Sequence, residues 1–309
     1  MKVRLTRFAA LSLAAALSLA GCASDDGQQK SEDPSPSADA SAQSGDVAVT
    51  EVKEPIFAVE QERGSAPTLS FSGDAPAELT RYVMDADSSG ADIAADDTVY
   101  AHYHGQVWDG EVFDSSYQRG APTAFSLEQV IPGWQSGLTG LHVGDRVQLS
   151  IPSQYGYPEG TPDGSIKPGE TIVFVVEIID AIGVDAEAPD AGEPIADAAD
   201  VGVDLTATDD TLKASLAEGA EIGPEVEVHQ LTAGTGAEIT NDGQAVALTY
   251  PFSPDGSALG DPERTQLDAA RMPELVGAKE GARFLFLAPA SAGAPEQIIV
   301  FQIVKAFTP

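Results

Sequence analysis

The chain has 309 residues, with 16 lysines and arginines against 49 aspartates and glutamates, which gives a net charge of −33 at pH 7. A field of this sign repels phosphate backbones and anionic headgroups, so nucleic-acid binding and polybasic membrane docking are excluded as leading functions. The apolar fraction of 42% is nevertheless sufficient for hydrophobic cores. At this length, roughly two domains are expected.

The N-terminus has the pattern of an export signal. Residues 1–7 carry three positive charges, and residues 8–20 form an apolar run too short to span a bilayer. The single cysteine, Cys22, follows Leu-Ala-Gly, which resembles a bacterial lipobox and implies a lipidated Cys22 after removal of residues 1–21. The alternative is an ordinary signal peptide with an incidental thiol. The sequence predicts an extracytoplasmic protein, lipid-anchored to the cell membrane.

Composition divides the remainder of the chain into four segments. Residues 22–65 are predicted to be the acylated cysteine and a flexible tether, because Ser, Asp, Ala, Gln, Gly and Pro dominate its first part without apolar periodicity. Residues 66–182 are predicted to form a first domain. Residues 183–199, rich in Ala, Pro and acidic residues, are predicted to be a linker to a second domain at residues 200–309.

Within the first domain, strand signals alternate with turn signals. Residues 98–104 alternate as a strand, and the Asp-Gly pair after Trp108 marks a turn. One short helix is expected over residues 129–138, with Pro132 in its first turn. Short strands are then expected over residues 147–152 and 172–179.

The C-terminal stretch repeats this pattern faintly, which predicts a duplicated domain; chance similarity is the alternative. The matched positions keep their order along the chain: Ser89–Ile93 with Thr235–Ile239, Tyr103 with Tyr250 after one inserted residue, Leu138–Arg146 with Leu275–Arg283, and Val173-Phe174 with Val300-Phe301.

The most informative residues of the first domain form a series of motifs in a fixed order: Tyr103-His104-Gly105, Trp108-Asp109-Gly110, Val112–Ser116, Val130–Trp134, Leu138, Gly140, Val143-Gly144, Ile151-Pro152, Tyr155–Tyr157 and Thr171–Phe174. In this order and spacing they closely resemble the FKBP-type peptidyl-prolyl cis-trans isomerases over about residues 66–182. The tethered, double-domain arrangement looks like actinobacterial lipoproteins of that family. The resemblance implies an α+β fold in which a curled antiparallel β-sheet wraps around a short helix, here duplicated.

The same residues also suggest a site without reference to the family. They contain more large apolar side chains than one small core requires, with Asp114 beside Phe113. Such a set suits an aromatic-walled pocket with few polar groups, which fits a proline ring. No nucleophile–base pair is evident, which argues against hydrolysis or group transfer.

The resemblance implies a role for each site residue. Trp134 would form the floor of the pocket, and the Ile131 backbone N–H and the Tyr157 hydroxyl would bind substrate carbonyls. Asp114 would act electrostatically near the rotating amide, oriented partly by Tyr103 and Arg119. The predicted catalytic residues are Tyr103, Phe113, Asp114, Ile131, Trp134 and Tyr157, and the predicted substrate-binding residues are Arg119, Val130, Ile166 and Phe174.

Two segments depart from the family pattern. Thr123 stands where a second aromatic residue often lies at the edge of the pocket, and Ser165-Ile166 replaces the apolar pair that closes the flap. In the second domain the positions of Phe113-Asp114 fall at Leu259-Gly260, that of Trp134 at Arg271, and the flap shrinks to residues 290–297. This domain is predicted to keep the fold and to lack catalysis.

The predicted function is isomerisation of Xaa-Pro bonds by the first domain, assisting the folding of exported proteins at the outer face of the cell membrane. The predicted partners are Xaa-Pro segments of exported proteins and macrolide ligands of the family, with no cofactor. The alternative is a non-catalytic peptide-binding or chaperone module.

Two metal-like patterns are weaker. Residues 85–96 mimic a calcium loop, but Asp92 stands where an apolar residue is expected, which favours a turn. His102 and His104 share a strand face and are interpreted as structural, so no metal site is predicted.

Overall fold

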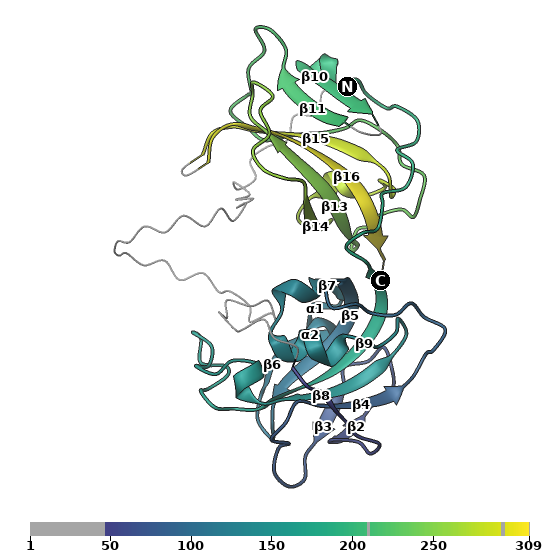
Figure 1. The fold of residues 1–309 in the computed structure, drawn as a ribbon, viewed down its shortest axis with the longest axis vertical. Coiled ribbons are helices and arrows are strands. Elements are labelled where there is room, and N and C mark those ends of the chain that lie inside the picture. Colours follow the sequence, from purple (N-terminus) through teal and green to yellow (C-terminus); the bar gives the residue numbers. More distant parts are fainter. Residues whose placement is uncertain (1–46, 209–210, 292–293, 309) are drawn as a thin grey trace. The chain divides into compact units, whose positions relative to one another are not determined.

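The structure is a computed structural model that describes residues 47–208, 211–291 and 294–308. The predicted signal peptide, Cys22 and residues 23–46 of the tether lie outside these residues. In the described part of the chain, no helix is sufficiently long and apolar to cross a membrane. Strands gather in residues 47–182, here called the first half, and in residues 189–308, the second half (Figure 1).

The first half contains a 7-stranded sheet in the order β1-β4-β8-β9-β5-β6, in which β7 also pairs with β5, before the part of β5 that pairs with β6. All pairings are antiparallel except that of β1 with β4. The elements are β1 (Thr50–Glu51), β2 (Ala58–Glu60), β3 (Thr68–Ser70), β4 (Thr80–Asp85), β5 (Thr98–Val107), β6 (Val112–Ser115), α1 (Ser116–Arg119), β7 (Thr123–Ser126), the 3₁₀ turn η1 (Leu127–Gln129), α2 (Pro132–Leu138), β8 (Arg146–Ile151), η2 (Ser153–Tyr155) and β9 (Ile172–Ile182).

The helix α2 packs on the inner face of this sheet and closes the first core (Figure 1). It begins at Pro132, whose fixed φ suits a first helical position, as predicted. Its C-terminal carbonyls are bound from the sheet, because the Arg81 guanidinium donates to the oxygens of Gly137 (3.0 Å) and Thr139 (2.9 Å). The floor of the predicted site is therefore held against the sheet by a polar clamp as well as by apolar contacts.

The prediction of one short helix was incomplete. A single further turn, α1, follows β6 directly and ends at Gly120, which has a φ of 83°. Glycine adopts this left-handed backbone conformation without steric cost, which explains why the turn ends at Gly120. Four residues are too few to show helical periodicity, so the sequence pattern did not reveal α1.

Part of the predicted tether is structured on the outer face of the first sheet. Phe57 is buried beside Val173 and Val175, and the hairpin β2–β3 covers the same face. The backbone N–H groups of Ile56 and Phe57 donate to the Gln148 side chain at 2.8 and 3.2 Å. Residues 47–65 therefore pack with the first half, and composition missed them because their apolar residues are scattered.

The second half contains a 5-stranded antiparallel sheet in the order β12-β15-β16-β13-β14, and a separate hairpin β10–β11. Its hairpin also packs on the outer face of its own sheet. The elements are η3 (Ala198–Val201), β10 (Val203–Thr208), β11 (Thr211–Leu216), β12 (Glu227–Gln230), β13 (Gln244–Phe252), β14 (Glu263–Asp268), η4 (Pro273–Leu275), β15 (Arg283–Ala288) and β16 (Gln297–Phe307).

Residues 189–196, which were predicted to be linker, pair with the second half. The N–H of Ile195 donates to the Leu231 carbonyl at 2.8 Å, and that of Gly234 to the Ala191 carbonyl at 2.7 Å. An extended chain can form such backbone bonds with almost any side chains, so composition alone does not reveal them.

The two halves share one sheet topology, which confirms the α+β fold class and supports its duplication. The first-half order β4-β8-β9-β5-β7 corresponds to β12-β15-β16-β13-β14. Both central pairings also contain a bulge at the same point, between Tyr100 and Ala101 in β5 and between Val246 and Ala247 in β13. A shared irregularity of this kind is a stronger sign of common descent than shared strand count.

The bulge corrects two matched positions. Tyr103 lies opposite Val176, and Thr249, two residues after Ala247, lies opposite Phe301. The counterpart of Tyr103 is therefore Thr249 and not Tyr250, and no residue is inserted between the bulge and this position. By the same register, the counterpart of Phe174 is Ile299 and not Phe301.

Candidate functional site

The predicted site residues of the first half meet around Trp134, whose side chain is fully buried on α2. Its indole forms edge-on contacts with three rings, Tyr103 at 5.6 Å, Phe125 at 5.1 Å and Phe174 at 5.2 Å between centroids. Edge-to-face pairs of this kind are favourable because the positive edge of one ring meets the negative face of another. The arrangement gives a rigid aromatic base to the inner face of the sheet.

Phe113 extends this aromatic cluster toward the surface. It is only partly buried, and its ring meets that of Phe174 edge-on at 5.6 Å. The approach depends on Gly105 in β5, since a Cβ atom there would lie 2.7 Å from Phe174 and 2.8 Å from Phe113. The sequence shows Gly105 only as part of a motif, because its steric role depends on the packing of Phe113 and Phe174.

Asp114 supplies the buried charge beside these rings. Its carboxylate accepts hydrogen bonds from the Tyr103 hydroxyl and from the Arg119 guanidinium, and the same guanidinium donates to the Tyr103 oxygen at 2.5 Å. The Asp114 side chain is 2% exposed and that of Arg119 is 35% exposed. Burial and the adjacent Asp114 charge raise the pKa of Tyr103 well above its usual value, so Tyr103 stays a hydrogen-bond donor.

Ser116 fastens this charged group to the sheet, a role that the sequence did not reveal. Its hydroxyl accepts from the Tyr103 backbone N–H at 2.8 Å and lies 3.2 Å from the Tyr103 carbonyl. The His102 ring nitrogen Nδ1 lies 2.9 Å from the same oxygen. Ser116 thereby joins the start of α1, which carries Arg119, to the strand that carries Tyr103.

The remaining predicted residues lie on the loops around the cluster. Val130, Ile131 and Ile166 are buried in the same apolar core, and Tyr157 packs against it. Among the described residues, none accepts a hydrogen bond from the backbone N–H of Ile131. Burial and the Asp114 charge raise the pKa of Tyr157 to about 12, so its hydroxyl keeps its proton at neutral pH. All ten predicted site residues therefore belong to one continuous region.

Among the described residues of the second half, none forms a comparable aromatic site at the corresponding place. The counterpart of Trp134 is Arg271, whose side chain is 81% exposed, and only the short turn η4 remains of the helix. The N–H of Leu259 donates to the carbonyl of Pro251, which is the counterpart of Gly105. Because Gly105 lies opposite Asp114, the counterpart of Asp114 is the apolar Leu259 and not Gly260 as predicted. The connection from β15 to β16 covers residues 289–296, against residues 152–171 in the first half.

The interior of the second half is filled in another way. Phe284 and Phe301 stack face to face at 5.0 Å with an interplanar angle of 6°. Their counterparts in the first half are the aliphatic pair Val147 and Val176. The second half thus fills the helix side of its sheet with rings carried by strands, whereas the first half places Trp134 there from the helix.

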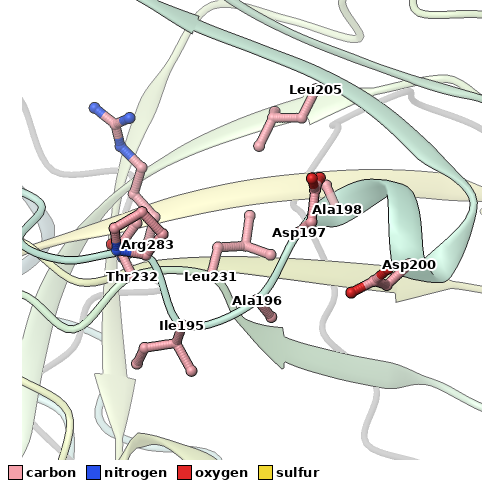
Figure 2. Close-up of a pocket in the computed structure, with 10 residues that line it drawn as sticks. Ile195, Ala196, Asp197, Ala198, Asp200, Leu205, Leu231, Thr232 and Arg283 are labelled. Atoms are coloured by element: carbon pink, nitrogen blue, oxygen red, sulfur yellow. The ribbon is translucent and has the colours of Figure 1, made fainter.

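An open hollow in the second half lies apart from this place (Figure 2). It is formed where residues 194–200 run beside β10 and the end of β12, with Leu205 and Leu231 facing into it and Arg283 at one edge. It contains no aromatic residue, and nothing in its lining provides the chemistry predicted from the sequence.

The metal-like patterns have structural roles in the described residues. Asp87 accepts from the Ser89 N–H at 3.0 Å within a turn, and the His102 ring stacks on that of Tyr117 with 4.5 Å between centroids. No group of three or more His, Cys, Asp or Glu side chains in the described ranges could hold a metal ion.

Comparison with known proteins assigns this site to a family. Residues 90–179 match the family model of FKBP-type peptidyl-prolyl cis-trans isomerases. A probable FKBP-type isomerase of Haemophilus influenzae is 41% identical over 99 residues, covering 32% of this chain and 41% of that protein. The isomerase FKBP15-1 of Arabidopsis thaliana is 45% identical over 85 residues, covering 27% and 56%. The crystal structure of FkpA from Escherichia coli matches at 40% identity with a TM-score of 0.31, covering 34% of this chain and 48% of that one.

The matched part spans roughly half the length, or less, of these relatives. It contains the aromatic cluster around Trp134, the Asp114 carboxylate with its partners Tyr103 and Arg119, and the loop between Tyr157 and β9. It stops before the second half. Residues 90–179 of this chain belong to the FKBP-type peptidyl-prolyl cis-trans isomerase family.

Proposed function

We propose that this protein catalyses the cis-trans isomerisation of Xaa-Pro peptide bonds, and that the first half alone carries the activity. The observation that carries the proposal is the buried Asp114 carboxylate, held by Tyr103 and Arg119 at the edge of a cluster centred on Trp134. An apolar, aromatic-lined pocket at this place would accept a proline ring.

The reaction needs no covalent step. Resonance in the amide bond creates a rotation barrier of about 18–20 kcal/mol, and uncatalysed prolyl isomerisation takes roughly tens to hundreds of seconds. The planar amide is the more charge-separated form, so an apolar site disfavours it relative to the twisted transition state. Each reduction of the barrier by about 1.4 kcal/mol accelerates the reaction tenfold.

Three groups orient the substrate in this proposal. The Ile131 N–H and the Tyr157 hydroxyl donate to carbonyl oxygens that flank the proline. The Asp114 carboxylate stays close to the rotating amide because Tyr103 and Arg119 hold it in one position. Fixed dipoles and charges need little reorganisation during the reaction, which is how a preorganised site stabilises a transition state.

The second half is proposed to be non-catalytic. An exposed arginine, Arg271, replaces the tryptophan at the base of the site, and the apolar Leu259 replaces the aspartate. The β15–β16 connection is also much shorter than the loop between β8 and β9. The shared sheet topology then serves as a scaffold.

The protein is proposed to act at the outer face of the cell membrane, anchored through lipidated Cys22. Support comes from the short apolar run of residues 8–20 and the Leu-Ala-Gly-Cys pattern. The proposed substrates are Xaa-Pro segments of exported proteins, and macrolide ligands would compete for the same pocket. The proposed reaction uses no cofactor.

The two tryptophans of the chain allow a direct test. Trp134 lies in the proposed pocket, whereas Trp108 packs against Phe71 (4.9 Å) on the outer face. In Trp108→Phe, a short Xaa-Pro peptide is expected to change the remaining fluorescence, and NMR exchange spectroscopy should show faster cis-trans exchange of the peptide. A peptide with alanine in place of proline is the matched control.

The outcomes separate the two candidate functions. Accelerated exchange supports the isomerase. A fluorescence change without acceleration would favour the non-catalytic binding module. Accelerated exchange without a fluorescence change would place the proline site elsewhere in the protein, and no change in either measurement would contradict both functions.

A further inference from the structure

The loop between Tyr157 and β9 contains one inward-facing residue. Of residues 157–170, only Ile166 is buried, at 1% exposure, and it joins the apolar core that contains Trp134. Its neighbours on both sides are polar or exposed, so apolar contacts of the loop do not by themselves fix the position of Ile166.

Asp163 organises this loop from its exposed side. Its Oδ1 accepts hydrogen bonds from the Thr161 hydroxyl at 2.5 Å, from the Ser165 N–H at 3.1 Å and from the Ser165 hydroxyl at 2.9 Å. These bonds, that of the Thr161 hydroxyl first, hold the pKa of Asp163 below its ordinary value. The carboxylate is therefore ionised at neutral pH and accepts all of these bonds.

The Thr161 hydroxyl connects Asp163 to Ile166 through hydrogen bonds. While its proton points to Asp163, its oxygen accepts the Ile166 N–H at 3.1 Å. The Thr161 N–H in turn donates to the Ile166 carbonyl at 2.9 Å. At Gly160, where φ is 75°, a Cβ atom would lie 2.6 Å from that carbonyl, so the loop is closely packed at this point.

We propose that Asp163 is a positioning residue of the isomerase site, which acts through Thr161 to hold Ile166 in the wall that contacts the bound peptide. The proposal rests on the proposed function. It concerns binding more than bond rotation, because Ile166 supplies apolar contact whereas Asp114 supplies the charge near the amide. It also adds a specificity element on a loop that departs from the family pattern.

The test uses the full chain with three variants. Asp163→Ala removes the acceptor, Asp163→Asn keeps an oxygen for the same bonds, and Thr161→Val breaks the connection to Ile166. The matched control is Asp255→Ala, because Asp255 in the second half accepts from the Ser253 hydroxyl and from the Ser257 N–H at 2.9 Å in a similar turn.

Loss of one such bonding group should raise KM by about two- to tenfold with kcat changed less than about twofold. We expect this for Asp163→Ala and Thr161→Val, a smaller rise for Asp163→Asn, and none for Asp255→Ala. The Ile166 δ1-methyl NMR signal should shift in Asp163→Ala and in Thr161→Val. This signal reports on the loop independently of turnover.

The activity of the unmodified chain separates two kinds of failure. If the unmodified chain has no isomerase activity, the proposed function fails, whatever the loop does. If the chain is active but Asp163→Ala leaves KM unchanged, the positioning role is overturned, whether or not the methyl signal moves. A fall in kcat alone would also contradict it.

Discussion

The two halves of this protein have the same sheet order and the same bulge, and both place aromatic rings on the helix side of the sheet. Among the described residues, only the first half adds a buried carboxylate, Asp114, and a tryptophan carried by the helix. Trp134 is fully buried in the first half, and its counterpart Arg271 is 81% exposed. The second half fills its core with the Phe284–Phe301 stack instead. A sheet of this topology is therefore stable without the site, so the site residues are an addition to the fold and not a requirement of it.

The helix side shows where the difference arises. In the first half, α2 is a helix of two turns whose carbonyls are bound by Arg81, and Trp134 lies in its first turn. In the second half, η4 retains only Leu275, the counterpart of Leu138 at the helix end. The second half therefore lacks the turn that carries Trp134 but keeps the buried leucine at the end of the helix.

The largest effect is expected where the halves differ most in burial. Trp134→Ala should lower the free energy of unfolding by about 3–5 kcal/mol, because it empties a fully buried site. The matched change Arg271→Ala should alter stability by less than about 0.5 kcal/mol, as for other exposed positions. Denaturant unfolding followed by circular dichroism measures both. Equal effects would mean that the two positions do not correspond.

Gly105→Ala should crowd the aromatic cluster of the first half without removing any of its side chains. The new Cβ would meet Phe174 and Phe113, so overpacking should destabilise the protein by about 1–3 kcal/mol and displace the Phe113 ring. The isomerisation rate should then fall at least about tenfold, the equivalent of 1.4 kcal/mol in the barrier. Gly260→Ala is the control, since a Cβ there meets nothing within 4 Å. An active Gly105→Ala protein would place the substrate away from Phe113.

Ser116→Ala tests whether the charged group needs its attachment to the sheet. The substitution removes the acceptor of the Tyr103 N–H, which should cost about 1–3 kcal/mol for the buried donor. We expect a several-fold loss of kcat with little change in KM, because Arg119 and Tyr103 would hold Asp114 less rigidly. Steady-state kinetics distinguishes this from a binding defect, which would appear in KM.

The smallest effect concerns pH. The folded-state pKa of Tyr157 is raised to about 12 from an ordinary value of 10.0, so the folded protein binds this proton more tightly than the unfolded chain does. The stabilisation is fully present below about pH 10 and is lost as the pH rises toward 12. Isomerase activity should therefore not fall between about pH 7 and pH 10 through Tyr157. Tyr157→Phe is the control, and a step in activity near pH 9 that this variant abolishes would contradict the account.

Much of the first half could be predicted from its residues. The alternating strand at residues 98–104, the helix started by Pro132 and the buried strand from Ile172 all form as expected, because periodicity and turn residues act locally. The ten predicted site residues also lie together, since the motif that suggested them preserves their spacing.

The parts that could not be predicted depend on contacts between distant residues. The attachment of Ser116 to Tyr103, the packing of Phe57 on the sheet and the pairing of Ile195 with Leu231 involve no periodic pattern. The matches of Tyr103 with Tyr250 and of Phe174 with Phe301 were also wrong, because identical residue types were matched where the bulge sets the alignment. Conserved geometry here is a property of backbone pairing, which single residues reveal poorly.

The central claim is that the first half alone catalyses isomerisation. The most direct measurement is the cis-trans exchange rate of an Xaa-Pro peptide with the full chain carrying Asp114→Ala and Trp134→Ala together, compared with the unmodified chain. The account predicts that the double variant gives only the uncatalysed rate, whether or not its first half remains folded. Acceleration above that rate would show that catalysis does not depend on the site around Asp114 and Trp134, and would contradict the account.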